Sequence, residues 1–166
     1  MLPDRDRWSG AWSGLADELT AWKAGVLTED QALAGHSFAP DYVRWQTGRN
    51  RERLDLVLLH NLGRAHPRDR PALHRVVREA FVVLEEAVAA GHVAGYGIAT
   101  WAGLEEEVFT VGELLALAAG AGGCRHRLVA VQMPVSLVMM APVAQALRGA
   151  FSDRCRVRDV SAAVIQ

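Results

Sequence analysis

The stretch RLDLVLLHN at residues 53–61 decides the fold, because an apolar run ends there in two polar side chains that can do chemistry. Its apolar residues predict a strand that is buried on both faces, as in a parallel sheet covered by helices: Leu54, Leu56, Val57, Leu58 and Leu59. His60 would then lie at the carboxyl end of this strand. Open α/β sheets and β/α barrels place their functional groups at that end.

Two further strands are expected downstream, in VAGYGIATW at 93–101 and RLVAVQMP at 127–134. Apolar residues at helical spacing predict a helix before the second strand, from Pro71, which suits a first turn, to Gly91, which suits a left-handed end. A capping box at 110–113 predicts the start of a second helix. The order strand, helix, strand, helix, strand with short connections predicts an α/β domain with parallel strands and right-handed crossovers.

The regions around this centre are less regular. The sequence predicts a helix over about 13–24, a short helix after a capping box at 28–31, and a third helix that begins at Pro40. After the third strand, a helix over 143–151 is expected. For 160–165 two alternatives stay open, a last strand or a disordered end.

The composition is that of a single globular domain. The chain has 166 residues, of which 51% are hydrophobic and 22% charged, so it is long enough for a core of its own. The net charge of −1 gives no electrostatic reason to expect nucleic acid or an anionic membrane as a partner. No run reaches the ~18 apolar residues that a membrane-spanning helix needs.

The cysteines and histidines do not form a metal-binding pattern. Cys124 and Cys155 lie far apart and follow no signal peptide, so a reduced, cytoplasmic chain is expected. The six histidines contain no i, i+4 pair of the H-E-x-x-H type, so no metal site is expected. The glycines at 120–123 are interpreted as a helix end and not as a phosphate-binding loop, because no strand and lysine flank them in the required order.

Three segments resemble, in the same order, the aldo-keto reductase family of NADPH-dependent (β/α)8-barrel oxidoreductases. They are RLDLVLLHN at 53–61, AFVVLEEAVAAGHVAGYGIATW at 80–101 and VAVQMP at 129–134. The fourth, fifth and sixth strands of the family read approximately DLYLLHN, GKIRAIGVSN and VVQLPYN. HSFAPDYV at 36–43 is also similar to a segment that precedes strand four in a bacterial subgroup. The resemblance is strongest over 25–140 and leaves 1–24 and 145–166 unassigned.

The resemblance implies one partial (β/α)8 TIM-barrel domain over residues 1–166, containing about strands four to six. His60 matches the catalytic histidine of the family, which orients the substrate carbonyl and assists proton donation. Asn61 follows it as in the family, and Gln132 matches the glutamine that contacts the nicotinamide carboxamide. Ala99 and Thr100 replace a Ser-Asn pair, so only the Thr100 hydroxyl is retained for this contact. NADPH is the implied cofactor and a small carbonyl compound the implied substrate.

The family's other catalytic residues have no counterpart in this chain. Its Asp, Tyr and Lys come from strands two and three and would lie upstream of Met1, and its phosphate-binding strands would lie downstream of about residue 145. The chain is also shorter than the ~250 residues of a typical β/α barrel. We therefore expect an oxidoreductase fragment with weak or no activity by itself, and whether it is an enzyme stays open. The alternatives are a non-catalytic half-barrel that associates with itself to cover its open sheet edges, and the remnant of a truncated reading frame.

Overall fold

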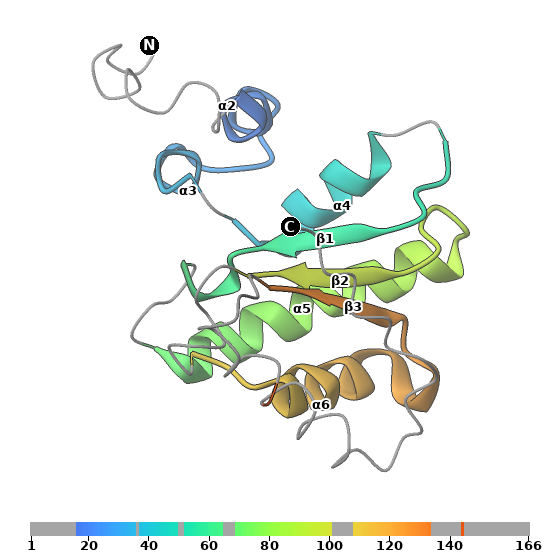
Figure 1. The fold of residues 1–166 in the computed structure, drawn as a ribbon. Helices are drawn as coiled ribbons and strands as arrows, with labels where there is room; N and C mark the ends of the chain where they lie inside the picture. The colour runs from blue at the N-terminus through green and yellow to red at the C-terminus, as the bar shows by residue number, and fades with distance from the viewer. Residues whose placement is uncertain are drawn as a thin grey trace.

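The chain forms an open three-stranded parallel sheet with helices in the connections (Figure 1). The strands are β1 (Val57–His60), β2 (Tyr96–Ala99) and β3 (Leu128–Gln132), in the order β1-β2-β3. Helices α5 (Arg70–Ala89) and α6 (Val111–Gly122) connect them, so the predicted α/β class and the parallel strands are confirmed. The computed structural model describes residues 16–35, 37–49, 52–64, 69–100, 108–133 and 144.

Both connecting helices begin and end where local sequence signals predict. The Asp69 side chain accepts a backbone N–H from the first turn of α5, and Gly91 follows the helix with a φ of 78°. Thr110 and Glu113 form the reciprocal capping box of α6, and Gly123, with a φ of 69°, ends that helix. Glycine adopts this left-handed backbone without the steric cost that a side chain adds.

The predicted helices of the N-terminal region are also present. They are α2 (Ala16–Lys23), α3 (Glu29–Leu33) and α4 (Pro40–Gly48), and the capping box of α3 joins Thr28 and Gln31. Two single-turn 3-10 helices, η1 (Leu62–Arg64) and η2 (Gly123–Arg125), complete the described elements. The helix expected over 143–151 (apart from residue 144) and the strand considered over 160–165 lie outside the described residues.

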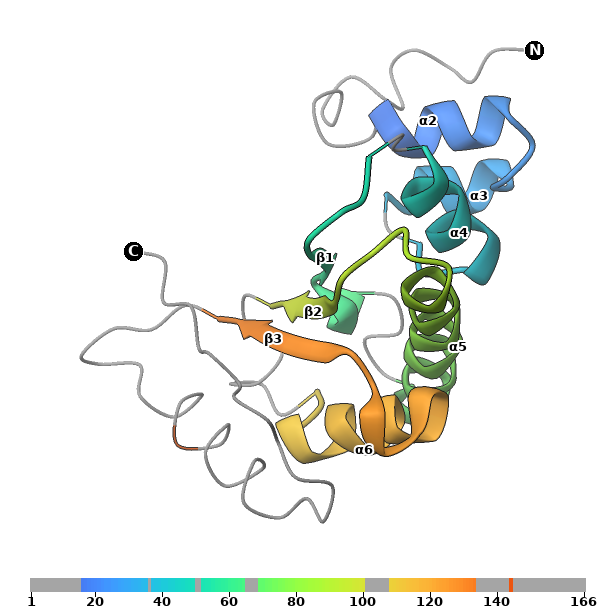
Figure 2. The ribbon, with the colours of Figure 1, turned by 90° about the vertical axis from the view of Figure 1, so that its right-hand side faces the viewer.

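The main core lies between the sheet and the two connecting helices. Figure 2 shows α5 and α6 on the same side of the sheet. Leu59 of β1 and Ile98 of β2 project into this core and meet Phe81 and Leu84 of α5 and Leu114 of α6. A second, smaller core joins α2, α3 and α4 through Ala21, Leu27, Ala32 and Tyr42. None of the described helices is long and apolar enough to cross a membrane.

The prediction that the first strand is buried on both faces is wrong. Leu59 is 6% exposed, but its neighbour Leu58 is 38% exposed and Leu56 is 43% exposed. Regular pairing also begins only at Val57, while Leu54 forms an isolated bridge with Val93. The reason is that successive strand residues point to opposite faces, and the described helices α5 and α6 pack on one face only.

A half-buried carboxylate, that of Glu85, ties the amino ends of β2 and β3 to α5. The Tyr96 hydroxyl donates a 2.7 Å hydrogen bond to Glu85 Oε1, and the Arg127 N–H donates to the same oxygen at 2.7 Å. Burial, together with the hydrogen bond to Glu85, raises the pKa of Tyr96 far above its ordinary value. Tyr96 is therefore a neutral structural residue at the end of the sheet opposite to His60.

Candidate functional site

The carboxyl ends of the three strands align in one row. His60 is paired with Ala99 in the β1–β2 ladder, and Ala99 is paired with Gln132 in the β2–β3 ladder. Because neighbouring strands lie ~4.8 Å apart, the Cα atoms of His60 and Gln132 are separated by about 10 Å. Paired residues of a parallel ladder point to the same face, so the side chains of this row face one small region.

The ladder continues one residue beyond the strands. The Asn61 N–H donates a 2.6 Å hydrogen bond to the Ala99 carbonyl, and the Thr100 N–H donates a 2.9 Å hydrogen bond to the Gln132 carbonyl. Asn61 has a φ of 52°, a conformation that asparagine tolerates better than most residues. The chain turns there directly into η1.

All four residues singled out in the sequence thus lie at one edge of the sheet. His60 is exposed, Asn61 and Gln132 are partly buried, and Thr100 is 6% exposed. A ligand at this edge would therefore meet His60, Asn61 and Gln132 more readily than Thr100. The catalytic role of His60 and the cofactor-binding roles of the other three stay predictions.

A tightly packed row lies directly behind this edge. Leu58, Gly97 and Ala130 are paired across the sheet, two residues before His60, Ala99 and Gln132 on their strands. A Cβ at Gly97 would lie 2.6 Å from the Ala130 carbonyl oxygen and 2.8 Å from Leu58 Cδ2. The close approach of the strands, and with it the position of Gln132 relative to Ala99, requires glycine at this position.

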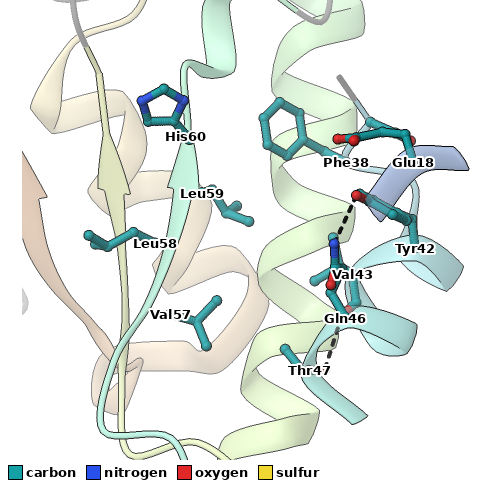
Figure 3. Close-up of a pocket in the computed structure, with 11 residues that line it drawn as sticks. Glu18, Phe38, Tyr42, Val43, Gln46, Thr47, Val57, Leu58, Leu59 and His60 are labelled. Carbon is teal, nitrogen blue, oxygen red and sulfur yellow. Dashed lines mark hydrogen bonds between the residues drawn. The ribbon is translucent and has the colours of Figure 1, made fainter. Parts of the chain in front are cut away.

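A separate cavity of about 260 Å³ lies between α4 and β1. Phe38, Glu18 and Tyr42 lie together on one wall, across from Leu59 and His60 of β1 (Figure 3). Further lining residues come from the loop before α4, from α4 and from β1: Ser37, Val43, Gln46, Thr47, Val57 and Leu58. His60 therefore borders both the carboxyl-end row and this cavity.

The polar groups of the cavity are linked by hydrogen bonds. Gln46 Nε2 donates a 2.9 Å hydrogen bond to the Tyr42 hydroxyl, one helical turn away on α4 (Figure 3). Burial raises the pKa of Tyr42 to about 12, and although the Gln46 bond lowers it, the neighbouring Glu18 carboxylate adds to the rise. Tyr42 therefore stays a neutral phenol beside the Glu18 carboxylate. Glu18 Oε2 is buried and has no hydrogen-bond partner among the described residues.

The sequence analysis did not identify this cluster. The i, i+4 spacing of Tyr42 and Gln46 was visible as a signal, because such residues are neighbours on a helix surface. Glu18 had no comparable signal, since it reaches the cavity only through the packing of α2 against α4. Within the described ranges, no three His, Cys, Asp or Glu side chains come together as metal ligands would.

Comparisons with known proteins do not identify the chain. No family model, no curated protein and no solved structure matches it. The resemblance to aldo-keto reductases therefore rests on the sequence segments alone.

The described residues fit one part of the implied NADPH cofactor. Gln132 lies in the carboxyl-end row and Asn61 one residue beyond it. Their side-chain amides offer the donors and acceptors that a nicotinamide carboxamide needs. The described residues at this edge offer no comparable site for the cofactor's phosphates. The glycines at the end of α6 lead instead into the amino end of β3, at the opposite edge of the sheet. The fit is therefore limited to the nicotinamide end.

Proposed function

We propose that this chain is the central part of an aldo-keto reductase-type β/α barrel, with β1, β2 and β3 as its fourth, fifth and sixth strands. The observation that carries the proposal is the row in which His60, Ala99 and Gln132 are in register. The three segments that resemble the family form adjacent parallel strands in the family's order, with α5 and α6 on one face, as the outer layer of a barrel requires.

The proposed chemistry is the reduction of a small aldehyde or ketone. Bound NADPH would supply the hydride. His60, at the end of β1, would donate a hydrogen bond to the carbonyl oxygen and so stabilise the negative charge that develops there, an effect worth ~10²–10⁴ in rate for a well-placed acid. Asn61 and Gln132 would hold the carboxamide, and the Thr100 hydroxyl would support it from its more buried position.

The described tyrosines do not supply the missing proton donor, which supports weak or absent activity in this chain alone. Tyr96 lies at the amino end of β2 and is engaged by Glu85. Tyr42 lies on α4, and its pKa is raised to about 12 instead of lowered. The single lysine of the sequence, Lys23, ends α2 and does not line the cavity with Tyr42.

The direct test is a fluorescence titration of the purified chain with NADPH. We expect weak binding that both His60→Ala and Gln132→Ala reduce further. His92→Ala is the matched control, because His92 is exposed and lies at the amino end of the sheet, next to the Leu54–Val93 bridge. A folded sample that binds no NADPH at millimolar concentration, or binding that all three variants leave unchanged, would contradict the proposal. If binding is seen, carbonyl reduction is then assayed.

A second candidate, a non-catalytic module that pairs with a second copy of itself, is favoured by the apolar side chains on the uncovered sheet face. Leu56 and Leu58 of the β1 segment and Val129 of β3 are each about two-fifths exposed. Sedimentation analysis at increasing concentration tests it. A dimer that Leu58→Glu dissociates and that Val82→Glu, an exposed residue on α5, leaves intact would favour this role. A monomer at every concentration would exclude it.

A further inference from the structure

The cavity between α4 and β1 contains a carboxylate whose hydrogen bonding is incomplete. The Glu18 carboxylate lies close enough to the Tyr42 hydroxyl to raise its pKa, but its Oε2 atom is buried and has no partner among the described residues. Buried polar atoms are almost always hydrogen-bonded, and a buried charge without a partner is strongly unfavourable. Within the part of the chain that the structure describes, no donor satisfies this atom, so a donor from elsewhere would complete its hydrogen bonding.

The charges around the cavity leave Glu18 uncompensated. None of the described residues that line it is Lys or Arg. The described arginines on and just after α4 are paired elsewhere. Arg44 pairs with Asp41 and Glu86, and Arg49, which follows the helix, pairs with Asp17. The described lining of the cavity thus supplies no Lys or Arg to compensate Glu18, and a group that complements it would carry a positive charge or at least a strong hydrogen-bond donor.

The remaining walls are suited to an apolar group of moderate size. Phe38 and Tyr42 present aromatic rings close to Glu18, and Val43, Val57 and Leu59 are aliphatic. Aromatic faces attract organic cations as well as apolar groups. The volume of about 260 Å³ exceeds that of the ~150 Å³ apolar cavities that accept benzene. A single carboxylate, however, is a poor site for a metal ion, which needs several oxygen or nitrogen ligands.

We propose that this cavity binds a small organic ammonium ion, with the ammonium group on Glu18 Oε2 and its aryl or alkyl group against Phe38, Val43 and Leu59. Each ammonium N–H that faces Glu18 completes a charge-assisted hydrogen bond that the free protein lacks. The site shares His60 with the carboxyl-end row, but the proposed contacts do not use His60, so the inference does not depend on the reductase proposal.

The test is isothermal titration calorimetry near neutral pH with benzylamine as the probe and benzyl alcohol as its neutral counterpart of the same shape. We expect benzylamine to bind at least tenfold more tightly than benzyl alcohol. Glu18→Gln keeps the shape and removes the charge, and it should weaken benzylamine binding about ten- to a hundredfold, the worth of a hydrogen bond to a charged group. Glu29→Gln, on the exposed first turn of α3, is the control and should leave binding unchanged.

An amide NMR titration of the unmodified chain keeps the test independent of how well the Glu18 variant folds. Benzylamine should shift the amide signals of Tyr42, Gln46 and Leu59 and leave those of β3 in place. The proposal is overturned if the folded chain binds no benzylamine at millimolar concentration. Equal binding of benzyl alcohol, an unaffected Glu18→Gln variant, or signal shifts confined to residues away from the cavity would each overturn it as well.

Discussion

Replacing Gly97 by alanine should destabilise the sheet at its tightest point. A Cβ at this position would lie 2.6 Å from the Ala130 carbonyl oxygen, 2.9 Å from Ala130 Cβ and 2.8 Å from Leu58 Cδ2. Leu58 can rotate away, since it is partly exposed, but the Ala130 oxygen belongs to the backbone of β3 and moves only with the strand. Overpacking of this kind costs typically ~1–3 kcal/mol, and we expect a value in the upper half of that range because backbone must shift.

Urea unfolding measures this cost directly. With a slope of about 2 kcal/mol per M, a loss of ~2 kcal/mol lowers the unfolding midpoint by about 1 M. Gly48→Ala is the matched control: a Cβ there meets nothing within 4 Å, and the residue ends α4 without a positive φ. Alanine at that position should be neutral or stabilising by up to ~1 kcal/mol. If Gly97→Ala unfolds at the same urea concentration as the parent chain, the close β2–β3 pairing described above is incorrect.

Three further changes test the contacts that hold the domain together. Tyr96→Phe removes the hydroxyl that donates to Glu85 and should lower the free energy of unfolding by ~1.5–3 kcal/mol in the same urea assay. An unchanged midpoint would contradict a charge-assisted hydrogen bond between the two side chains. Burial alone would raise the pKa of Glu113, but hydrogen bonds from Arg70 and from the helix cap outweigh it and lower the pKa. The stability that this pair contributes should therefore be complete above the ordinary carboxyl pKa of ~4.3, and it should be lost as pH falls through the lower pKa of the folded state. In Glu113→Gln, the urea midpoint should consequently fall less steeply with decreasing pH than in the parent chain. Gly91→Ala forces a side chain into a φ of 78° and should cost about 1–2 kcal/mol, and a stabilised variant would show that Gly91 does not end α5 in this conformation.

The helices were predictable because their boundaries depend on a few adjacent residues. The capping boxes at 28–31 and 110–113 satisfy backbone N–H groups within one turn, so the sequence contains the whole interaction. Gly91 likewise needs only its own backbone freedom to follow α5. The strands were predicted to begin too early, at Leu54 and Val93, because the apolar pattern continues through residues that make a single bridge before regular pairing starts.

The placement of the four candidate site residues was predictable for a different reason. Parallel, adjacent strands bring their carboxyl ends to one edge of the sheet, whatever the details of packing. The strand order therefore places four residues at the same edge: His60, Asn61, Thr100 and Gln132. The cavity beside them was not predictable. Glu18 joins it through contacts between helices that are far apart in sequence, and no local pattern encodes such contacts.

The exposed residues of β1 show what an apolar run can and cannot predict. Leu58 and Leu59 are equally apolar, yet Leu59 enters the core below α5 while Leu58 is 38% exposed on the opposite face. On that face there is a glycine in β2, Gly97, and another just before it, Gly95. Leu58 lies over Gly97 and Val129 over Gly95, each within 3 Å of where a Cβ would be. Among the described residues no helix covers this face, so the flanking side chains bury β2 and are themselves left partly open to solvent. Single exposed leucines are ordinary. Here, however, a leucine and a valine lie together over two glycines and form an apolar surface against which another layer of side chains could pack. The surface would be covered by the side chains that fill the lumen of a barrel, or by a second copy of the chain. NADPH binding tests the first possibility and sedimentation analysis tests the second.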